Sequence, residues 1–362
     1  MTASPASAFE TPRSPAERAN RHVLVCGVNW LGDSVMTMPA IRALRERRPE
    51  FRITMLVKPA LAPLWRMQPA VDDVLESPAG RGGVWRVARV LARKNCGTAY
   101  VLPNSFRSAL VPFLARVPER IGAPGHWRSW LLTRVVRAPA GRAEAGHQAF
   151  EYFDITGVPR DPQGLRMPCL PVPAAVVETV RGLLERRFGG GVRGWVGLMP
   201  GAARGPSKRW PAERFAEVGR RLARESGFGI LALGSVGERA LCQGVTEAIG
   251  AGASSLAGET SLAELAAVLS ICRVVVANDN GGMHLAAAVG ARVVAVFGMT
   301  DPATTGPLGE GHSIVRAEGV EGSRDIPRAS RAAVRALESI SAERVYEAAV
   351  SVLGRDAGGD AT

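Results

Sequence analysis

A carboxylate follows the first apolar segment of the chain. Residues 22–28 (HVLVCGV) form a short apolar run, and Gly32 and Asp33 come shortly after it. A run of this kind is typical of a strand buried in a parallel sheet. Asp33 could cap the next helix by accepting backbone N–H bonds. It could also act as a general base that takes the proton of a substrate hydroxyl.

A loop of small and basic residues follows a second apolar run at 195–200. Gly201 and Ala202 would let a ligand approach the backbone closely, while Lys208 and Arg209 add positive charge. The loop does not match the P-loop pattern G-x-x-x-x-G-K-[ST]. Its chemistry indicates a phosphate site, and the alternative is a basic surface loop.

A third group of residues, NDNGGMH at 278–284, stands between an apolar strand and a helix. Backbone N–H groups at a helix start bind anions, aided by the helix dipole. His284 could donate to a phosphate oxygen, or it could be a structural histidine of the helix. The residues assigned to this anion site are Asp279, Asn280, Gly281, Gly282 and His284.

Two more strand ends carry polar side chains. Glu238 could accept hydrogen bonds from a ribose diol or stabilise the first turn of a helix. Asn104, Ser105 and Arg107 follow the predicted strand 98–103 and could bind a substrate or cap a helix. Ligands of open α/β sheets bind at the carboxyl ends of the strands. All five groups therefore point to sites at such an edge.

Strand and helix patterns alternate in both halves of the chain. The predicted strands are 22–28, 51–57, 71–77 and 98–103, then 195–200, 229–234, 273–279 and 292–298. The predicted helices are 34–48, 83–94, 142–156, 211–225, 236–248, 261–271, 281–289 and 342–353. This alternation predicts an α/β fold with one parallel sheet in each half, covered by helices on both faces.

A proline-rich segment at 157–175 separates the two halves, because proline removes backbone donors and interrupts regular structure. A length of 362 residues also suits two domains, each with its own core. We therefore expect an N-terminal domain at 22–172 and a C-terminal domain at 173–354. Residues 1–21 and 355–362 are expected to be flexible tails.

The positive charge is concentrated in the first half. Residues 1–172 hold 24 Lys and Arg against 13 Asp and Glu, a net of +11, whereas residues 173–362 hold 21 against 20, a net of +1. This asymmetry indicates contact with nucleic acid, an anionic membrane surface or a phosphorylated acceptor. The alternative is solvated surface charge without a partner.

Cysteine usage and hydropathy exclude several classes of protein. The five cysteines are scattered without a C-x-x-C pair, which argues against a disulfide framework or a zinc site and suits a reducing compartment. No apolar run has the length of a membrane span, and the first residues lack the apolar core of a signal peptide.

The ordered set of motifs resembles the bacterial ADP-heptose:lipopolysaccharide heptosyltransferases over about residues 22–350. It consists of Gly32-Asp33, PNSFRSAL at 103–110, PGA at 200–202, KRWP at 208–211, LAGET at 256–260 and the group at 278–284. PNSFRSAL favours the heptosyltransferase II branch. The resemblance implies a GT-B architecture, with two Rossmann-like domains whose parallel sheets face each other across a cleft. It also implies inverting, metal-independent transfer of a heptose from ADP-heptose to the inner core of lipopolysaccharide.

The same resemblance assigns roles to residues. Asp33 would be the general base, Lys208 would neutralise the diphosphate leaving group, and Glu238 would hold the ribose. The donor side would comprise Gly201, Ala202, Lys208, Glu238, Asp279, Asn280, Gly281, Gly282 and His284. The acceptor side would comprise Gly32, Asn104, Ser105, Arg107 and Arg120.

The resemblance also implies partners and a location. No metal and no cofactor is expected besides the donor substrate, ADP-heptose. The other expected partners are the inner-core acceptor and the anionic inner leaflet, with no nucleic acid. The implied location is cytoplasmic and peripheral, at the cytoplasmic face of the inner membrane.

Three other functions compete with this interpretation. A GT-B enzyme with another nucleotide sugar or acceptor would share the motifs. A nicotinamide oxidoreductase would need G-x-G-x-x-G after a strand, and that pattern is absent at the expected place. A protein that docks on nucleic acid through its basic half would bind with a steep salt dependence and would not need Asp33.

Overall fold

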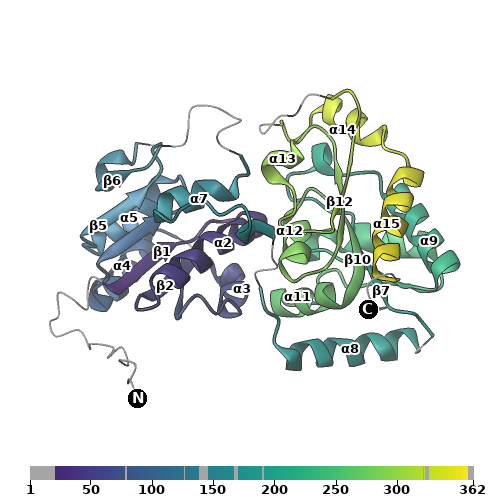
Figure 1. The fold of residues 1–362 in the computed structure, drawn as a ribbon, viewed down its shortest axis with the longest axis horizontal. Coiled ribbons are helices and arrows are strands. Elements are labelled where there is room, and N and C mark those ends of the chain that lie inside the picture. Colours follow the sequence, from purple (N-terminus) through teal and green to yellow (C-terminus); the bar gives the residue numbers. More distant parts are fainter. Residues whose placement is uncertain are drawn as a thin grey trace, which may run out of the picture.

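Two lobes lie side by side in the computed structural model (Figure 1). The structure describes residues 21–77, 80–125, 127–137, 146–166, 170–189, 191–320, 322 and 326–357. Each lobe is built on a six-stranded sheet, and the strand pairs are parallel throughout. No helix in these ranges is both long enough and apolar enough to cross a membrane.

The first lobe holds the strands β1 (His22–Cys26), β2 (Arg52–Val57), β3 (Asp73–Glu76), β4 (Thr98–Val101), β5 (Glu119–Gly122) and β6 (Arg134–Val135). Their order in the sheet is β3-β2-β1-β4-β5-β6, which is the Rossmann order. Successive residues of β1 point to opposite faces, so Val23 and Val25 enter one core while Leu24 and Cys26 enter another.

Helices cover both faces of this first sheet. The core on the Leu24 side is closed by α4 (Arg81–Lys94), α5 (Phe106–Leu114) and the short turn η2 (Ser129–Leu131). The other face packs against α2 (Leu31–Arg47), η1 (Pro59–Leu61), α3 (Ala62–Arg66) and α7 (Ala149–Thr156). The turn η3 (Gly164–Arg166) follows on the way to the second lobe.

The second lobe repeats the topology of the first. Its strands are β7 (Trp195–Met199), β8 (Gly229–Ala232), β9 (Ala253–Ser255), β10 (Cys272–Asn278), β11 (Val293–Phe297) and β12 (Ser313–Arg316). The order β12-β11-β10-β7-β8-β9 is the first lobe's order read from the other edge. Both sheets therefore reverse their strand order at one point, between β1 and β4 and between β7 and β10.

The helices of the second lobe also form two layers. One face carries α9 (Ala212–Ser226), α10 (Arg239–Ile249), α14 (Arg331–Glu338) and α15 (Ala342–Ala357). The other carries α8 (Ala174–Phe188), α11 (Leu262–Ile271) and α12 (Gly281–Ala288). Short turns η4 (Pro206–Lys208) and η5 (Val236–Glu238) and the helix α13 (Pro302–Thr305) lie in the connections.

The lobes meet where α2 packs against α12, near the middle of Figure 1. Apolar side chains of α2, α3, α11 and α12 belong to one continuous buried cluster that crosses from one lobe to the other. Burial of apolar surface of this kind stabilises the arrangement. The contact also places the start of α2 against the start of α12.

The structure confirms the predicted α/β class and all eight predicted strands, of which β3 lies at a sheet edge. Each observed strand lies within its predicted range or differs from it by one residue at an end. The helix predicted at 34–48 begins earlier, at Leu31, and the last helix continues past residue 354 to Ala357. Nearly the whole predicted N-terminal tail and part of the predicted helix 142–156 lie outside the described residues.

Several elements were not predicted. Sequence analysis missed the helices α3, α8, α13 and α14 and the strands β5, β6, β9 and β12, and it offered α5 only as the helix that Asn104 or Ser105 could cap. These strands are two to four residues long and mostly part-exposed, with sequences such as ERIG and ASS. Short strands near a sheet edge need no continuous apolar run, so they leave little pattern to detect.

Candidate functional site

Four of the five polar groups singled out in the sequence follow the strands at the two reversal points. Gly32 and Asp33 follow β1, and the loop with Asn104 follows β4; the Gly201 loop follows β7, and Asp279 follows β10. Glu238 follows the neighbouring strand β8. A crevice at such a reversal point is where open α/β sheets bind their ligands.

An ion pair joins the two second-lobe loops. The Lys208 ammonium lies 2.5 Å from Asp279 Oδ2, and both side chains are largely buried, with exposures of 14% and 7%. Lys208 ends the turn η4, so the loop after β7 folds back over the end of β10. The pair places the Lys208 ammonium beside the first residues of α12, where the Asp279 carboxylate balances its charge.

Two asparagines hold this loop in place. The side chain of Asn278 is fully buried; it donates to the Pro200 carbonyl at 2.8 Å and accepts from the Trp210 N–H at 3.0 Å. Asn280 caps α12 by accepting from Met283 N–H and donates to the Gly201 carbonyl at 2.7 Å.

Glu238 lies against Gly201. A Cβ added at Gly201 would stand 1.9 Å from Glu238 Oε1, so any larger residue there would displace the Glu238 carboxylate. The second carboxylate oxygen, Oε2, accepts from the backbone N–H and the hydroxyl of Ser235 in a capping box. Glu238 lies in the first turn, as its structural alternative expected, and the capping box with Ser235 adds to that role. Its Oε1 is directed toward the Gly201 loop.

His284 is buried in the first turn of α12, beside the contact between the lobes. Burial lowers the pKa of His284 to about 4, so its imidazole is neutral at pH 7. Its Nδ1 is buried and has no hydrogen-bond partner among the residues described. An orphaned polar atom at a helix start, where backbone N–H groups converge, suits a bound anion.

Two glycines bring the helix starts of the lobes together. A Cβ at Gly281 would lie 3.1 Å from the backbone nitrogen of Gly32, and a Cβ at Gly32 would lie 2.8 Å from the His284 ring. The absence of both side chains lets α2 approach α12 this closely. As a result Asp33, the residue after Gly32, stands at the same junction as His284.

Asp33 is not the cap of its helix. The N-cap position of α2 is Trp30, and Asp33 lies in the first turn, where its charge complements the helix dipole. Gln148 Nε2 donates to Asp33 Oδ1 at 3.5 Å and also contacts the Tyr152 hydroxyl. The carboxylate is thus oriented by α7, and the Gln148 backbone N–H bonds to the second lobe at Thr304.

The loop after β4 is open by comparison. Asn104, Ser105 and Arg107 are exposed, and Ser105 caps α5 by accepting from Ser108 N–H. The capping alternative is therefore confirmed for Ser105. Arg107 donates to the Gly80 carbonyl at 3.1 Å, which ties the start of α5 to the start of α4.

The buried Arg128 holds this loop in place through hydrogen bonds. Its guanidinium is fully buried and donates to the carbonyls of Pro103 and Ala123 and to the Ser108 hydroxyl. Three carbonyl or hydroxyl acceptors compensate part of the cost of burying the charge. The residue fixes the backbone immediately before Asn104.

Arg120 is not brought to this edge. It pairs in register with Ala99, early in β4, and its guanidinium donates to the carbonyls of Val117 and Leu131. Those bonds direct it back toward the beginning of β5 and over the Phe113 ring. The placement gives its predicted acceptor role no support.

Sequence analysis missed Gln148, His147 and Arg128. Gln148 and His147 lie at the start of α7, far along the chain from the residues they approach. His147 bonds to the Gly306 carbonyl, and burial lowers its pKa. The only signal in the sequence is that His147 and Gln148, two polar residues, precede an apolar helix. That pattern is too common to indicate a site. In the described ranges, no three His, Cys, Asp or Glu residues cluster so as to hold a metal ion.

Known proteins resemble this chain in sequence over most of its length. The sequence profile of glycosyltransferase family 9 (heptosyltransferase) matches residues 84–332. The chain is 31% identical to lipopolysaccharide heptosyltransferase 2 of Salmonella typhimurium over 348 residues, covering 92% of this chain and 99% of that protein. It is 33% identical to the Escherichia coli K12 protein of the same name over 306 residues, covering 81% and 87%.

A solved structure shares the whole architecture. The structure of E. coli ADP-heptose lps heptosyltransferase II superposes with a TM-score of 0.79 at 29% identity, over 92% of this chain and 99% of that one. Together with the two parallel sheets, this match confirms the predicted GT-B architecture of paired Rossmann-like lobes.

Proposed function

The chain belongs to glycosyltransferase family 9, the heptosyltransferases, and we propose that it transfers a heptose from ADP-heptose to the inner core of lipopolysaccharide. The observation that carries the site assignment is the junction of α2 and α12. There Asp33 of one lobe follows Gly32, which packs against the start of α12 in the other lobe, and Lys208 pairs with Asp279 just before that helix. That is the pairing a displacement needs: a base for the nucleophile and positive charge for the leaving group.

Asp33 acts on the acceptor in this proposal. It takes the proton of an acceptor hydroxyl while the hydroxyl oxygen bonds to the anomeric carbon of the heptose. The bond from that carbon to the diphosphate breaks, ADP departs with the electron pair, and the anomeric configuration inverts. The hydrogen bond from Gln148 supports this assignment, because it orients the carboxylate without protonating it.

The second lobe stabilises the departing ADP. Lys208 supplies positive charge, and the N–H groups at the start of α12 (Gly281, Gly282) supply dipoles that need no rearrangement. His284 offers a neutral donor, and Glu238 beside Gly201 accepts from the ribose. We further propose that these groups take the place of a divalent metal, so the reaction is metal-independent.

The first lobe receives the acceptor in this proposal. The exposed loop with Asn104, Ser105 and Arg107 lies at the β4 edge, and this half carries the +11 charge. Inner-core sugars bear phosphate and carboxylate groups and are attached to a lipid. We propose that the enzyme works peripherally at the anionic, cytoplasmic leaflet of the inner membrane.

Calorimetric titration with ADP, UDP and NAD, each with and without EDTA, tests the donor assignment. The expected result is preferential binding of ADP that persists in EDTA, followed by heptose transfer to an inner-core acceptor. A preference for UDP would move the donor to a uridine sugar on the same fold. Loss of ADP binding or transfer in EDTA, reversed by a divalent cation, would refute metal independence alone.

A further inference from the structure

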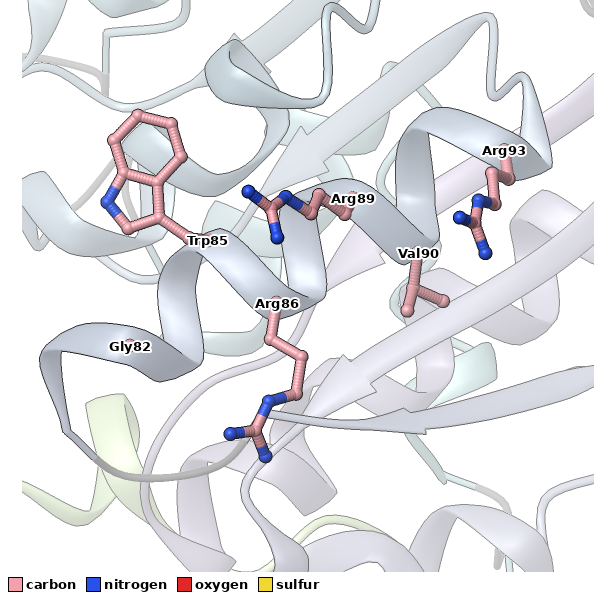
Figure 2. Close-up of a pocket in the computed structure, with 6 residues that line it drawn as sticks. All are labelled: Gly82, Trp85, Arg86, Arg89, Val90 and Arg93. Carbon is pink, nitrogen blue, oxygen red and sulfur yellow. The ribbon is translucent and has the colours of Figure 1, made fainter.

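The outer face of the first lobe combines arginines with exposed aromatic rings. Helix α4 (RGGVWRVARVLARK) carries four arginines, one lysine and no acidic residue. Its buried positions Val84, Val87 and Leu91 face the sheet, so Trp85 and Arg89 point outward. Figure 2 shows the outward side chains, which line a surface hollow of about 410 Å³; they are Trp85, Arg86, Arg89, Val90 and Arg93.

The neighbouring elements extend the same surface. Helix α5 packs beside α4 on the same face of the sheet, with Phe106 and Phe113 exposed. Trp130 contacts both rings in tilted and edge-on geometry, at centroid distances of 6.2 and 5.6 Å, and is itself 65% exposed. Trp85 is 60% exposed and Trp127 93%. We call these residues of α4, α5 and the η2 region the aromatic–arginine face.

The charge of this region is strongly one-sided. Residues 80–137 contain eleven Arg and Lys and a single acid, Glu119, a net of +10 out of +12 for the whole chain. The long surface helices of the second lobe, α8, α9 and α15, each contain two or more acidic residues. The exposed large hydrophobics of that lobe are aliphatic in the ranges described: Leu183, Val236, Ile314 and Val350.

We propose that the aromatic–arginine face is the surface by which the protein docks on an anionic lipid bilayer. Arginines near such a surface are attracted to lipid phosphates, and indole rings favour the interface between headgroups and acyl chains. A basic amphipathic helix with tryptophan is typical of proteins that lie on a membrane. Nucleic acid would also attract the charge, but the aliphatic and aromatic side chains between the arginines favour the lipid interface.

The location of this face adds a second argument. Arg107 bonds to the Gly80 carbonyl, so the exposed loop proposed for the acceptor is continuous with the start of α4. Docking through α4 and α5 would hold that loop close to the bilayer, where a lipid-linked acceptor presents its sugars. This step rests on the proposed function, whereas the lipid binding itself does not.

Vesicle co-sedimentation tests the proposal with the full chain. The probe is vesicles of phosphatidylcholine with one quarter phosphatidylglycerol at 0.15 M salt, against pure phosphatidylcholine. The expected result is binding to the anionic vesicles and roughly 100-fold weaker binding of the variant Arg86→Gln/Arg89→Gln/Arg93→Gln, at about one tenfold step or less per arginine. Trp85→Ser with Trp127→Ser should weaken binding further at high salt, where charge attraction is screened.

A matched control removes the same charge from the second lobe. The variant Arg186→Gln/Arg224→Gln/Arg335→Gln changes exposed arginines of α8, α9 and α14 and should bind the vesicles like the unchanged chain. Equal binding by both triple variants, or binding to duplex DNA but not to vesicles, would overturn the proposal. So would self-association in sedimentation velocity that the α4 variant abolishes, because the face would then join two copies.

Transfer to a delipidated, water-soluble inner-core acceptor separates this inference from the proposed function. The α4 variant should keep its full rate on that acceptor. Transfer without vesicle binding would overturn the docking proposal alone. Vesicle binding without transfer would leave docking intact and overturn the proposed heptose transfer.

Discussion

The two reversal points of the molecule share one topology and differ in how tightly they are built. At β7 and β10 the loops are tied together by a buried ion pair and by Asn278 and Asn280, so that Asp279 and His284 are almost fully buried. At β1 and β4 the corresponding loops expose Trp30, Asn104 and Arg107. The strand order is the same in both lobes. The two edges therefore differ in the side chains of their loops and not in the arrangement of their strands.

This difference matches two kinds of ligand. A small ligand of constant structure can be bound by fixed dipoles, whose orientation costs nothing at the moment of reaction. A large acceptor attached to a surface needs an open edge that it can approach. The second lobe suits the first task and the first lobe suits the second. Asp33 is the exception in the first lobe, since Gln148 and the α2–α12 contact fix its position.

Replacing Asp33 tests that exception and should have the largest effect. Asp33→Asn keeps the size of the side chain but removes the base, so we expect kcat to fall by roughly 10²–10⁴-fold. ADP affinity should stay unchanged, because the residue acts on the acceptor. Single-turnover transfer and calorimetry measure the two quantities. Normal turnover in this variant would remove Asp33 as the base.

Replacing Lys208 tests whether the tight second-lobe edge serves ADP or only the fold. Lys208→Met leaves Asp279 buried and unpaired, which should destabilise the protein by about 3–5 kcal/mol. The double variant Lys208→Met/Asp279→Asn removes the orphaned charge and should recover most of that stability. Denaturant titration measures both variants.

The ADP affinity of the double variant tests whether Lys208 binds ADP. A lost charge-assisted contact should weaken ADP binding by roughly 10–150-fold. If the double variant refolds and binds ADP with unchanged affinity, Lys208 is a structural residue and the comparison of the two edges loses its functional meaning.

The buried His284 makes stability depend on pH. Its pKa is about 4 when folded and 6.5 ordinarily, so the unfolded chain binds more protons between these values. The stabilisation is complete above about pH 6.5 and is lost as the pH falls toward 4, by up to about 3 kcal/mol. His284→Gln should remove this part of the pH dependence. His22, His147 and His312 also have lowered pKa values, so the difference between the two proteins is the quantity to measure.

Replacing Gly32 tests the contact between the edges. In Gly32→Ala the new Cβ would stand 2.8 Å from the His284 ring, so either that ring or α2 must shift. A displacement of about 1 Å at a reacting group costs up to roughly 100-fold in rate, and we expect a 10- to 100-fold loss of kcat with ADP affinity little changed. Gly244→Ala is the control, because beyond the adjacent backbone of its own helix no atom lies within 4 Å of its added Cβ. Equal activity of the two variants would show that the junction tolerates the shift.

The sequence predicted where along the chain the site residues lie, but not which contacts their side chains make. Inner strands of a parallel sheet are continuous apolar runs, so their ends, and the polar groups that follow, can be predicted. Which of those groups cap a helix depends on local geometry: Ser105 caps α5, and Glu238 is the partner of Ser235 in a capping box. The contacts of Gln148 with Asp33 and of Gly32 with Gly281 join distant segments, and no local pattern carries them. The placement of Arg120 away from this edge could not be predicted for a similar reason, since the direction of its side chain follows from the carbonyls of Val117 and Leu131.

Replacing Asn104 should have the smallest effect and probes the open edge directly. Asn104 is exposed in the loop before α5, and Asn104→Ala should change the unfolding free energy by about 0.5 kcal/mol or less. One neutral hydrogen bond to an acceptor contributes about 0.5–1.5 kcal/mol, so the KM for the acceptor should rise roughly 2- to 12-fold with kcat little changed. ADP affinity serves as the internal control. A loss of ADP binding instead, or a large loss of stability, would mean that the first-lobe edge is built as tightly as the second and that its exposure does not reflect a site for a large acceptor.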